Sequence, residues 1–143
     1  MPYEFVDDLT VADIAFHAWD RDLEALFVSA AEAVMHTMVE DLDSIRARDT
    51  RELSLEHDAL DMLLFNFLQE LIYYKDAEQL LLRVQRLRIG QDRQPYSLQA
   101  TAVGEPIDVN RHHLRVDVKA VTLHRFALTQ SERGWEATVI LDI

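Results

Sequence analysis

Alternating apolar and polar residues mark the last third of the chain. In the run 114–124, Leu114, Val116, Val118 and Ala120 fall on one face, whereas Asp117 and Lys119 fall on the other. The run 135–143 repeats this pattern, with Trp135, Ala137, Val139 and Leu141 in phase. A period of two is typical of a half-buried strand. Since the Gly-containing segment 131–134 separates the runs, the pattern predicts an antiparallel hairpin.

Further extended segments are expected earlier in the chain. Alternation in residues 10–18 predicts a strand with Asp13 on the face away from Ile14, and residues 51–56 predict a short strand after the charged connection 44–50. Residues 80–89 and 96–103 are expected to be strands joined by a turn at 90–95. Gly104-Glu105-Pro106 is expected to break the second of these strands.

Helical spacing appears in two places. One apolar stripe is typical of a helix that Asp20 or Asp22 caps at its amino end. The second helix begins at His57 or Asp58 and ends within residues 76–79. The residues of the two stripes are Leu23, Leu26, Phe27, Ala30, Val34 and Met38, and then Leu60, Leu63, Leu64, Phe67, Leu68 and Leu71.

These elements indicate an α+β fold, in which two helices pack on a mostly antiparallel sheet of six or seven strands. A length of 143 residues fits a single domain, 1–143. The chain has no cysteine, no signal-peptide pattern and no apolar run near the ~20 residues that span a bilayer. A cytoplasmic protein without membrane contact is therefore expected.

Charge restricts the partners of the protein. The 26 acidic and 14 basic residues give a net charge of −12, and strong direct binding of nucleic acid is not expected without a basic patch. Arg83, Arg86 and Arg88 form a basic cluster, but acidic segments surround it. Such a chain suits divalent cations or a basic protein surface. The acidity could equally serve solubility alone.

Candidate chemistry is sparse. His112 and His113 are neighbours whose side chains would point to opposite faces of a strand, so both cannot easily bind one ion. A loop edge with one packed histidine is expected instead. His124 is in phase with an apolar face and is expected to be buried, whereas Lys119 is expected to be solvated. Asp13 and Asp142, with the Ile143 carboxylate alongside, offer hard oxygen ligands for Ca²⁺ or Mg²⁺. The sequence alone does not show that the first and last strands are neighbours.

Several segments resemble the archease family, whose members assist the GTP-dependent tRNA-splicing ligase of the RtcB type. The resemblance covers nearly the whole chain, and the segments from Val118 onward are its most specific part. The matching segments are Ala12-Asp13-Ile14, Leu23-Glu24-Ala25-Leu26-Phe27, residues 61–72, Gly104-Glu105-Pro106, Asp108-x-x-Arg111-His112, Val118-Lys119-Ala120-Val121-Thr122-x-His124 and residues 135–143. One departure precedes Asp13, because Leu9-Thr10-Val11 replaces the family's acidic residue, histidine and threonine.

The resemblance implies a function and a site. Archeases accelerate the guanylylation of an RtcB-type RNA ligase and support its multiple turnover in tRNA splicing or RNA repair, without catalysing ligation themselves. A divalent cation, with Ca²⁺ expected first and Mg²⁺ or Mn²⁺ as alternatives, would be held by Asp13, Asp142 and Ile143. Lys119 would be the family's functional lysine, and His112 and His124 are secondary candidates.

Two other classes of function remain open. The protein could be an acidic adaptor that binds a basic partner without metal, or a metal-dependent hydrolase in which Asp13 and Asp142 activate water. A second carboxylate pair or a nearby histidine would favour the hydrolase. The position of Asp13 relative to Asp142 is the observation that bears most on these alternatives.

Overall fold

The computed structural model describes residues 2–6 and 13–143. It contains two α-helices, a short 3₁₀ helix and seven strands, which confirms the α+β class. The elements in chain order are β1 (Tyr3–Val6), β2 (Asp13–Asp20), α1 (Leu23–Met38), η1 (Leu42–Ser44), β3 (Asp49–His57), α2 (Leu60–Glu78), β4 (Leu80–Gly90), β5 (Tyr96–Pro106), β6 (Ala120–Ser131) and β7 (Gly134–Asp142).

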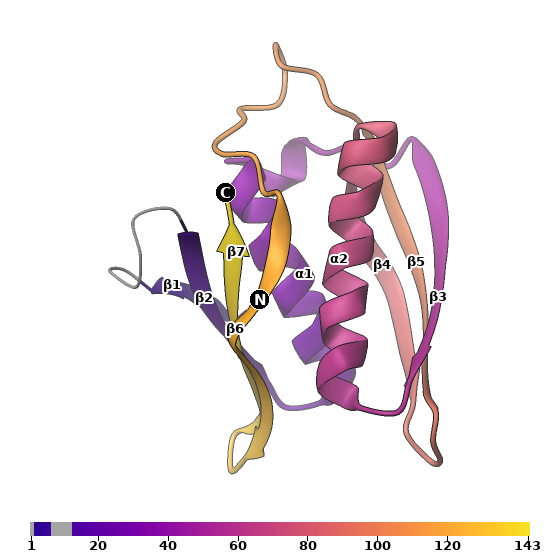
Figure 1. Cartoon of the computed structure of the whole chain (residues 1–143). Coiled ribbons are helices and arrows are strands. Elements are labelled where there is room, and N and C mark those ends of the chain that lie inside the picture. The colour runs from indigo at the N-terminus through magenta and orange to yellow at the C-terminus, as the bar shows by residue number, and fades with distance from the viewer. Residues whose placement is uncertain (1, 7–12) are drawn as a thin grey trace.

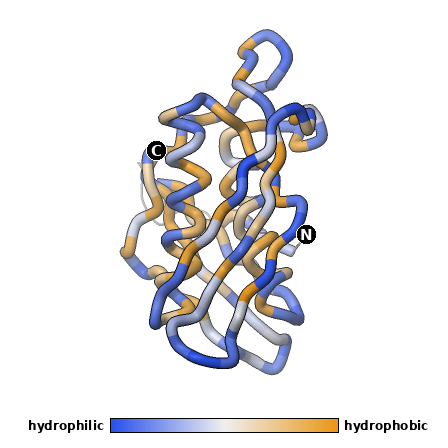
Figure 2. Tube along the Cα trace, turned by 90° about the vertical axis from the view of Figure 1, so that its right-hand side faces the viewer, coloured by the Kyte–Doolittle hydropathy of each residue, from blue (hydrophilic) through white to orange (hydrophobic). Residues whose placement is uncertain are grey.

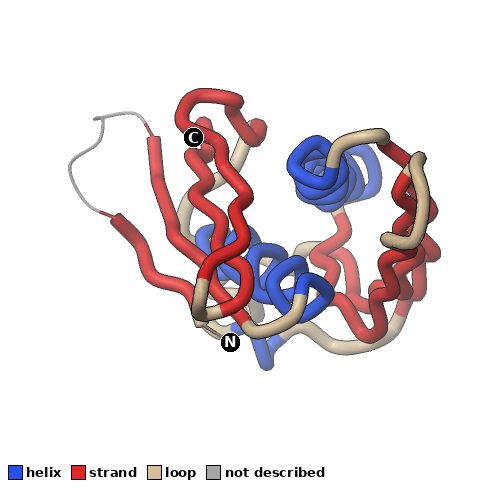
Figure 3. The backbone as a smooth tube through the Cα atoms, turned by 90° about the horizontal axis from the view of Figure 1, so that it is seen from below, coloured by secondary structure: helices blue, strands red, loops and turns tan. Residues whose placement is uncertain are grey.

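The strands form two antiparallel sheets instead of one. The first has the order β1-β2-β7-β6 and the second the order β3-β5-β4. Seen from below, the helices lie between the sheets (Figure 3). Helix α1 contacts β2 and β7 of the first sheet and β4 of the second, whereas α2 contacts β6 and all three strands of the second sheet. Each helix therefore connects the two sheets.

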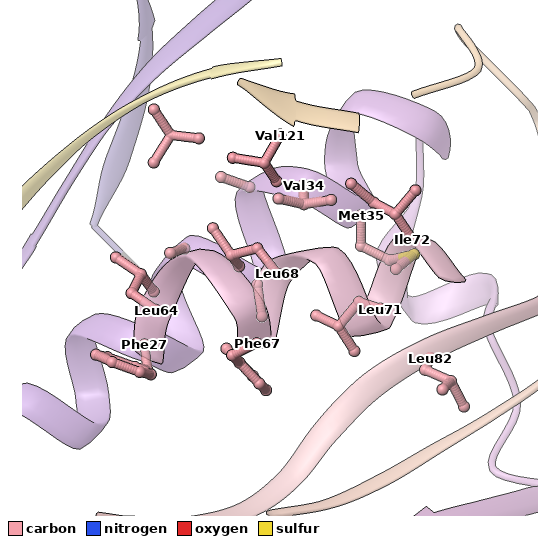
Figure 4. Packing of buried hydrophobic residues seen from close by; sticks show 14 of the residues in the cluster. Phe27, Val34, Met35, Leu64, Phe67, Leu68, Leu71, Ile72, Leu82 and Val121 are labelled. Atoms are coloured by element: carbon pink, nitrogen blue, oxygen red, sulfur yellow. The ribbon is translucent and has the colours of Figure 1, made fainter. Parts of the chain in front are cut away.

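The core forms where the helices meet. Four α2 residues, Leu64, Phe67, Leu68 and Leu71, are fully buried. They face residues of α1 such as Phe27, with Val121 of β6 and Leu82 of β4 nearby (Figure 4). Burying each large apolar side chain stabilises the fold by roughly 1.5–3 kcal/mol. Hydrophilic residues dominate the turns at the lower end of the molecule (Figure 2).

The ends of the helices follow local chemistry. The Asp22 carboxylate accepts a hydrogen bond from the Ala25 N–H at 2.8 Å, which confirms one of the two predicted caps. The second helix was expected to begin at His57 or Asp58, but α2 begins at Leu60, and no side chain caps its N-cap residue Ala59. Gln79 ends α2 in the left-handed conformation, at φ 54°. Neither described helix is long and apolar enough to cross a membrane.

The strand predicted at 114–124 begins later than expected. Residues 114–119 are not a strand, and β6 runs from Ala120 to Ser131. The main chain of 113–116 instead pairs with the end of α1, since Glu40 N–H donates to the His113 carbonyl and Arg115 N–H to the Met38 carbonyl. Local alternation cannot reveal this competing partner. The hairpin itself is confirmed, because β6 pairs with β7 as far as Ser131 and Gly134.

Strand β5 continues through Gly104-Glu105-Pro106, so the predicted break there is wrong. Gly104 pairs with both Asp49 of β3 and Leu82 of β4. A Cβ at this position would lie 1.7 Å from the Leu81 carbonyl oxygen. The glycine therefore permits a close strand contact and does not end the strand.

Gly104→Ala is expected to lower the free energy of unfolding by about 3 kcal/mol, the upper end of the usual cost of overpacking. The cost is high because the backbone must move to admit the methyl group. Gly90→Ala is the control, because its Cβ would meet the Ser97 Oγ at 2.7 Å, and that hydroxyl can rotate away. Urea denaturation measures both variants. Equal losses in the two would contradict this account of Gly104.

Candidate functional site

The carboxylates of Asp13 and Asp142 lie on neighbouring strands. Asp13 opens β2, Asp142 closes β7, and the two residues are direct partners in the antiparallel ladder between these strands. Directly opposite residues have their side chains on the same face of a sheet, with Cβ atoms about 4.5–5.5 Å apart. The fold therefore joins residues that are far apart in the sequence, and we call them the carboxylate pair.

Two other residues predicted for this site, Lys119 and Ile143, lie next to Asp142 along the main chain. Ala120, at the start of β6, is the second ladder partner of Asp142. The Lys119 N–H donates to the Asp142 carbonyl at 2.8 Å, and the Lys119 side chain is exposed. Ile143 follows Asp142 and is partly buried. Figure 1 shows the start of β2 and of β6, the end of β7 and the end of α2 at one end of the molecule.

The electrostatics of the carboxylate pair are unfavourable without a counter-charge. Like charges directly opposite each other destabilise a sheet by up to about 1 kcal/mol. Among the described residues, no side chain forms a hydrogen bond or ion pair with either carboxylate. A cation at this place would remove the repulsion between them.

The donor set of the carboxylate pair fits a hard cation in part. Carboxylate oxygens suit Ca²⁺ and Mg²⁺, but Ca²⁺ takes about 6–8 oxygens. Within residues 2–6 and 13–143 there is no group of three or more His, Cys, Asp or Glu residues that could hold a metal. Asp7, Asp8 and the segment Leu9-Thr10-Val11 lie outside the described residues. Further oxygens would come from water, the main chain or a partner.

His112 has a structural environment apart from the carboxylate pair. It is 1% exposed, its Nδ1 accepts from the Asp108 N–H at 2.9 Å, and its Nε2 donates to Glu105 Oε2, also at 2.9 Å. The Arg111 guanidinium forms an ion pair with the same carboxylate. The expectation that one histidine of the 112–113 pair is packed is confirmed, because His113 is exposed.

The buried carboxylate of Glu105 is ionised. Burial by itself would raise its pKa, but hydrogen bonds from Arg111, from the Arg46 N–H and from His112 outweigh that effect and lower the pKa to about 2. Glu105 thus fixes the first part of the connection 107–119, which leads from β5 to Lys119.

Comparison with known proteins identifies the family. The profile described as "Archease protein family (MTH1598/TM1083)" matches residues 3–143. The chain belongs to the archease family.

Individual relatives support this assignment. The archease of Methanosarcina barkeri is 32% identical over 142 residues, which cover 99% of this chain and 95% of that protein. The archease of Pyrococcus abyssi is 32% identical over 133 residues, which cover 92% and 93% of the two chains. Each relative is matched over almost its full length.

Solved structures agree with the fold. The solution structure of protein 1598 of Methanobacterium thermoautotrophicum matches with a TM-score of 0.84 at 32% identity, over 99% of this chain and 98% of that one. A crystal structure of an archease from Thermotoga maritima matches with a TM-score of 0.57 at 14% identity, over 94% and 93%. The second likeness concerns the fold alone.

His124 is exposed in this archease-family chain, so its predicted burial is wrong. The register between β6 and β7 shifts between Thr122 and Ala127, and Arg125 has a positive φ of 54°. This wide bulge interrupts the alternation that placed His124 in phase with apolar residues. His124 lies four positions along β6 from Ala120, the ladder partner of Asp142, and is therefore not next to the carboxylate pair.

Sequence reasoning missed two charged residues that hold the connection 107–119, which leads to the candidate site. Glu105 was interpreted as part of a break, and Lys75 was not considered. Lys75 follows Leu68, Leu71 and Ile72 at helical spacing on the buried face of α2. A lysine on an otherwise apolar stripe signals a buried partner, because an unpaired ammonium is costly to bury.

Proposed function

We propose that the protein is an accessory protein of an RtcB-type RNA ligase, which promotes the ligase's guanylylation and multiple turnover in tRNA splicing or RNA repair. The observation that carries the proposal is the ladder pairing of Asp13 with Asp142 beside Lys119. Membership of the archease family supports it. The protein would act by presenting this end of the molecule to the ligase.

The carboxylate pair would hold a divalent cation, with Ca²⁺ favoured, and Mg²⁺ or Mn²⁺ as alternatives. Asp13 and Asp142 would each contribute carboxylate oxygen, and Ile143 would contribute a further oxygen. When bound, the cation would supply positive charge that offsets the negative charge of a nucleoside triphosphate. A bound cation would relieve the repulsion between the two carboxylates, and this relief would favour binding of the ion.

Charge would guide the association. The net charge of −12 favours encounter with a positively charged pocket, and such steering raises association rates at low ionic strength. Lys119 is exposed, and its main chain is hydrogen-bonded to that of Asp142. Its ammonium would pair with a phosphate or with an acidic residue of the ligase.

One observation favours a second candidate, a metal-independent adaptor. Among the described residues, no third His, Cys, Asp or Glu joins the carboxylate pair in a group that could hold a metal ion. An adaptor of this kind would use Asp13 and Asp142 to bind basic residues directly. A Ca²⁺ titration separates the two candidates, because the unfolding temperature of an adaptor would not change with the ion.

The test of the proposed function follows enzyme-bound GMP when the protein is mixed with its cognate RtcB-type ligase, GTP and a divalent ion. Wild type is expected to accelerate guanylylation, and Asp142→Asn is expected to lose most of that acceleration. Asp92→Asn is the control, because it removes the same charge from the exposed turn between β4 and β5.

Two results would refute the proposal. One is the absence of acceleration by wild-type protein. The other is equal acceleration by Asp142→Asn and wild type, which would remove the carboxylate pair from the function.

A further inference from the structure

Lys75 is a buried cation close to the candidate site. It lies in the last turn of α2, and its side chain is 5% exposed. Its Nζ donates to Asp117 Oδ1 at 2.6 Å, to the Val118 carbonyl at 2.9 Å and to the Asp76 carboxylate. An ammonium group has three donors, so all of them are used.

The bond to Val118 places Lys75 on one side of a single peptide group. The carbonyl of Val118 and the N–H of Lys119 belong to the same planar unit. Lys75 holds the carbonyl, and the Asp142 carbonyl accepts from the N–H at 2.8 Å. The 118–119 peptide is thus held from both sides, by α2 and by the end of β7.

We infer that Lys75 is a positioning residue, which orients the 118–119 peptide and so fixes Lys119 beside the carboxylate pair. Lys75 needs no contact with metal or ligase for this role. The inference rests on the proposed function only where the ligase is used as a readout, because the orientation of the peptide can be measured in the protein alone.

The charge of Lys75, and not only its volume, matters for this role. Burial by itself would lower the pKa of Lys75, but its hydrogen bonds with Asp117 and Asp76 outweigh burial, and the net shift is upward. The ammonium therefore stays charged. Asp76 and Asp117 are 55% and 68% exposed, so water can solvate them without Lys75, whereas the Val118 carbonyl would lose its partner.

Simple packing is the competing explanation. Val118 is fully buried, and its side chain anchors this part of the connection whether or not Lys75 is charged. An anchored side chain still leaves the adjoining peptide plane free to rotate, since rotation requires changes in the two flanking dihedral angles only. The two explanations differ in what happens to the Lys119 amide.

Amide hydrogen exchange followed by NMR tests the inference. In Lys75→Met, the Lys119 amide is expected to exchange at least about 10-fold faster than in wild type, because a charged hydrogen bond is lost. This acceleration should exceed any change at the Leu68 amide, which reports on the core. Lys75→Arg keeps a cation and is expected to recover part of the protection. The double variant Asp76→Asn/Asp117→Asn keeps the bond to the carbonyl and is expected to exchange like wild type at Lys119.

The outcomes are distinct. If Lys75→Met accelerates exchange at Lys119 and Leu68 by the same factor, Lys75 only stabilises the fold and the inference fails. If Lys75→Met does not fold, the wild-type protein provides the test, because its Lys75 ammonium protons should give a slowly exchanging NMR signal. The absence of that signal would overturn the inference.

A ligase assay then connects the inference with function. Lys75→Met and Lys119→Ala are expected to reduce the stimulation of guanylylation by similar factors, and the double variant is expected to show no further loss. Independent, multiplying losses would mean that Lys75 does not act through Lys119. Faster Lys119 exchange without any effect on the ligase would keep the positioning role and show that stimulation of the ligase does not depend on the position of Lys119.

Discussion

Glu105→Gln is expected to lower the free energy of unfolding by about 2–3 kcal/mol, because the buried carboxylate loses charged hydrogen bonds. Glu105 is 2% exposed, and its Oε2 accepts from the Arg46 N–H at 2.8 Å and from His112 at 2.9 Å. The glutamine would leave the Arg111 guanidinium without its carboxylate. Urea denaturation at neutral pH measures the loss.

Glu132→Gln is the matched control, because Glu132 is exposed in the turn between β6 and β7. Its unfolding free energy should stay within about 0.5 kcal/mol of wild type, as for most surface substitutions. Indistinguishable losses in the two variants would contradict the structural role of Glu105.

The pH dependence of stability provides a second check on Glu105. The folded pKa of about 2 lies below the usual 4.5, so Glu105 contributes stability that is fully present above pH 4.5. That contribution is lost as the pH falls from 4.5 towards 2, because the unfolded chain takes up the proton first. Between these values the stability of wild type should fall more steeply than that of Glu105→Gln.

The second large effect concerns the carboxylate pair. Without divalent ions, Asp142→Asn is expected to be more stable than wild type by up to about 1 kcal/mol, because it removes like charges from opposite ladder positions. With Ca²⁺ at 100 times its dissociation constant, wild type should gain about 2.7 kcal/mol, and the variant should gain little. The order of stability therefore reverses when Ca²⁺ is added.

Urea denaturation in EDTA and in Ca²⁺ measures this reversal, with Asp92→Asn as the charge-matched control. A wild type whose stability does not respond to Ca²⁺ would favour the adaptor. A variant that gains as much as wild type would place the ion elsewhere on the protein.

The helices and most strands could be predicted because their signals are local. Apolar residues at helical spacing defined α1 and α2, and the turn at 90–95 separated β4 from β5. Residues 114–119 alternate as a strand does, yet their main chain pairs with the end of α1. The bulge between Thr122 and Ala127 was likewise hidden, because the register of a strand depends on its partner.

The candidate site could be predicted only through resemblance to the family. Nothing in the spacing of Asp13 and Asp142 shows that β2 and β7 are neighbours, since their pairing is set by the whole topology. Glu105 was concealed by glycine and proline on either side of it, which are typical of a turn. Gly104 is needed because the Leu81 carbonyl approaches its Cα closely. This contact between strands is apparent only in the three-dimensional structure.

Isothermal titration calorimetry of Ca²⁺ into wild type, Asp13→Asn, Asp142→Asn and the double variant tests most directly whether the carboxylate pair is a single site. Wild type is expected to bind about one ion per chain, and each single variant is expected to lose affinity by on the order of 100-fold, because ligand charge sets the affinity of such sites. The double variant should be no weaker than the single ones within error. Wild-type affinity in either single variant would contradict the account.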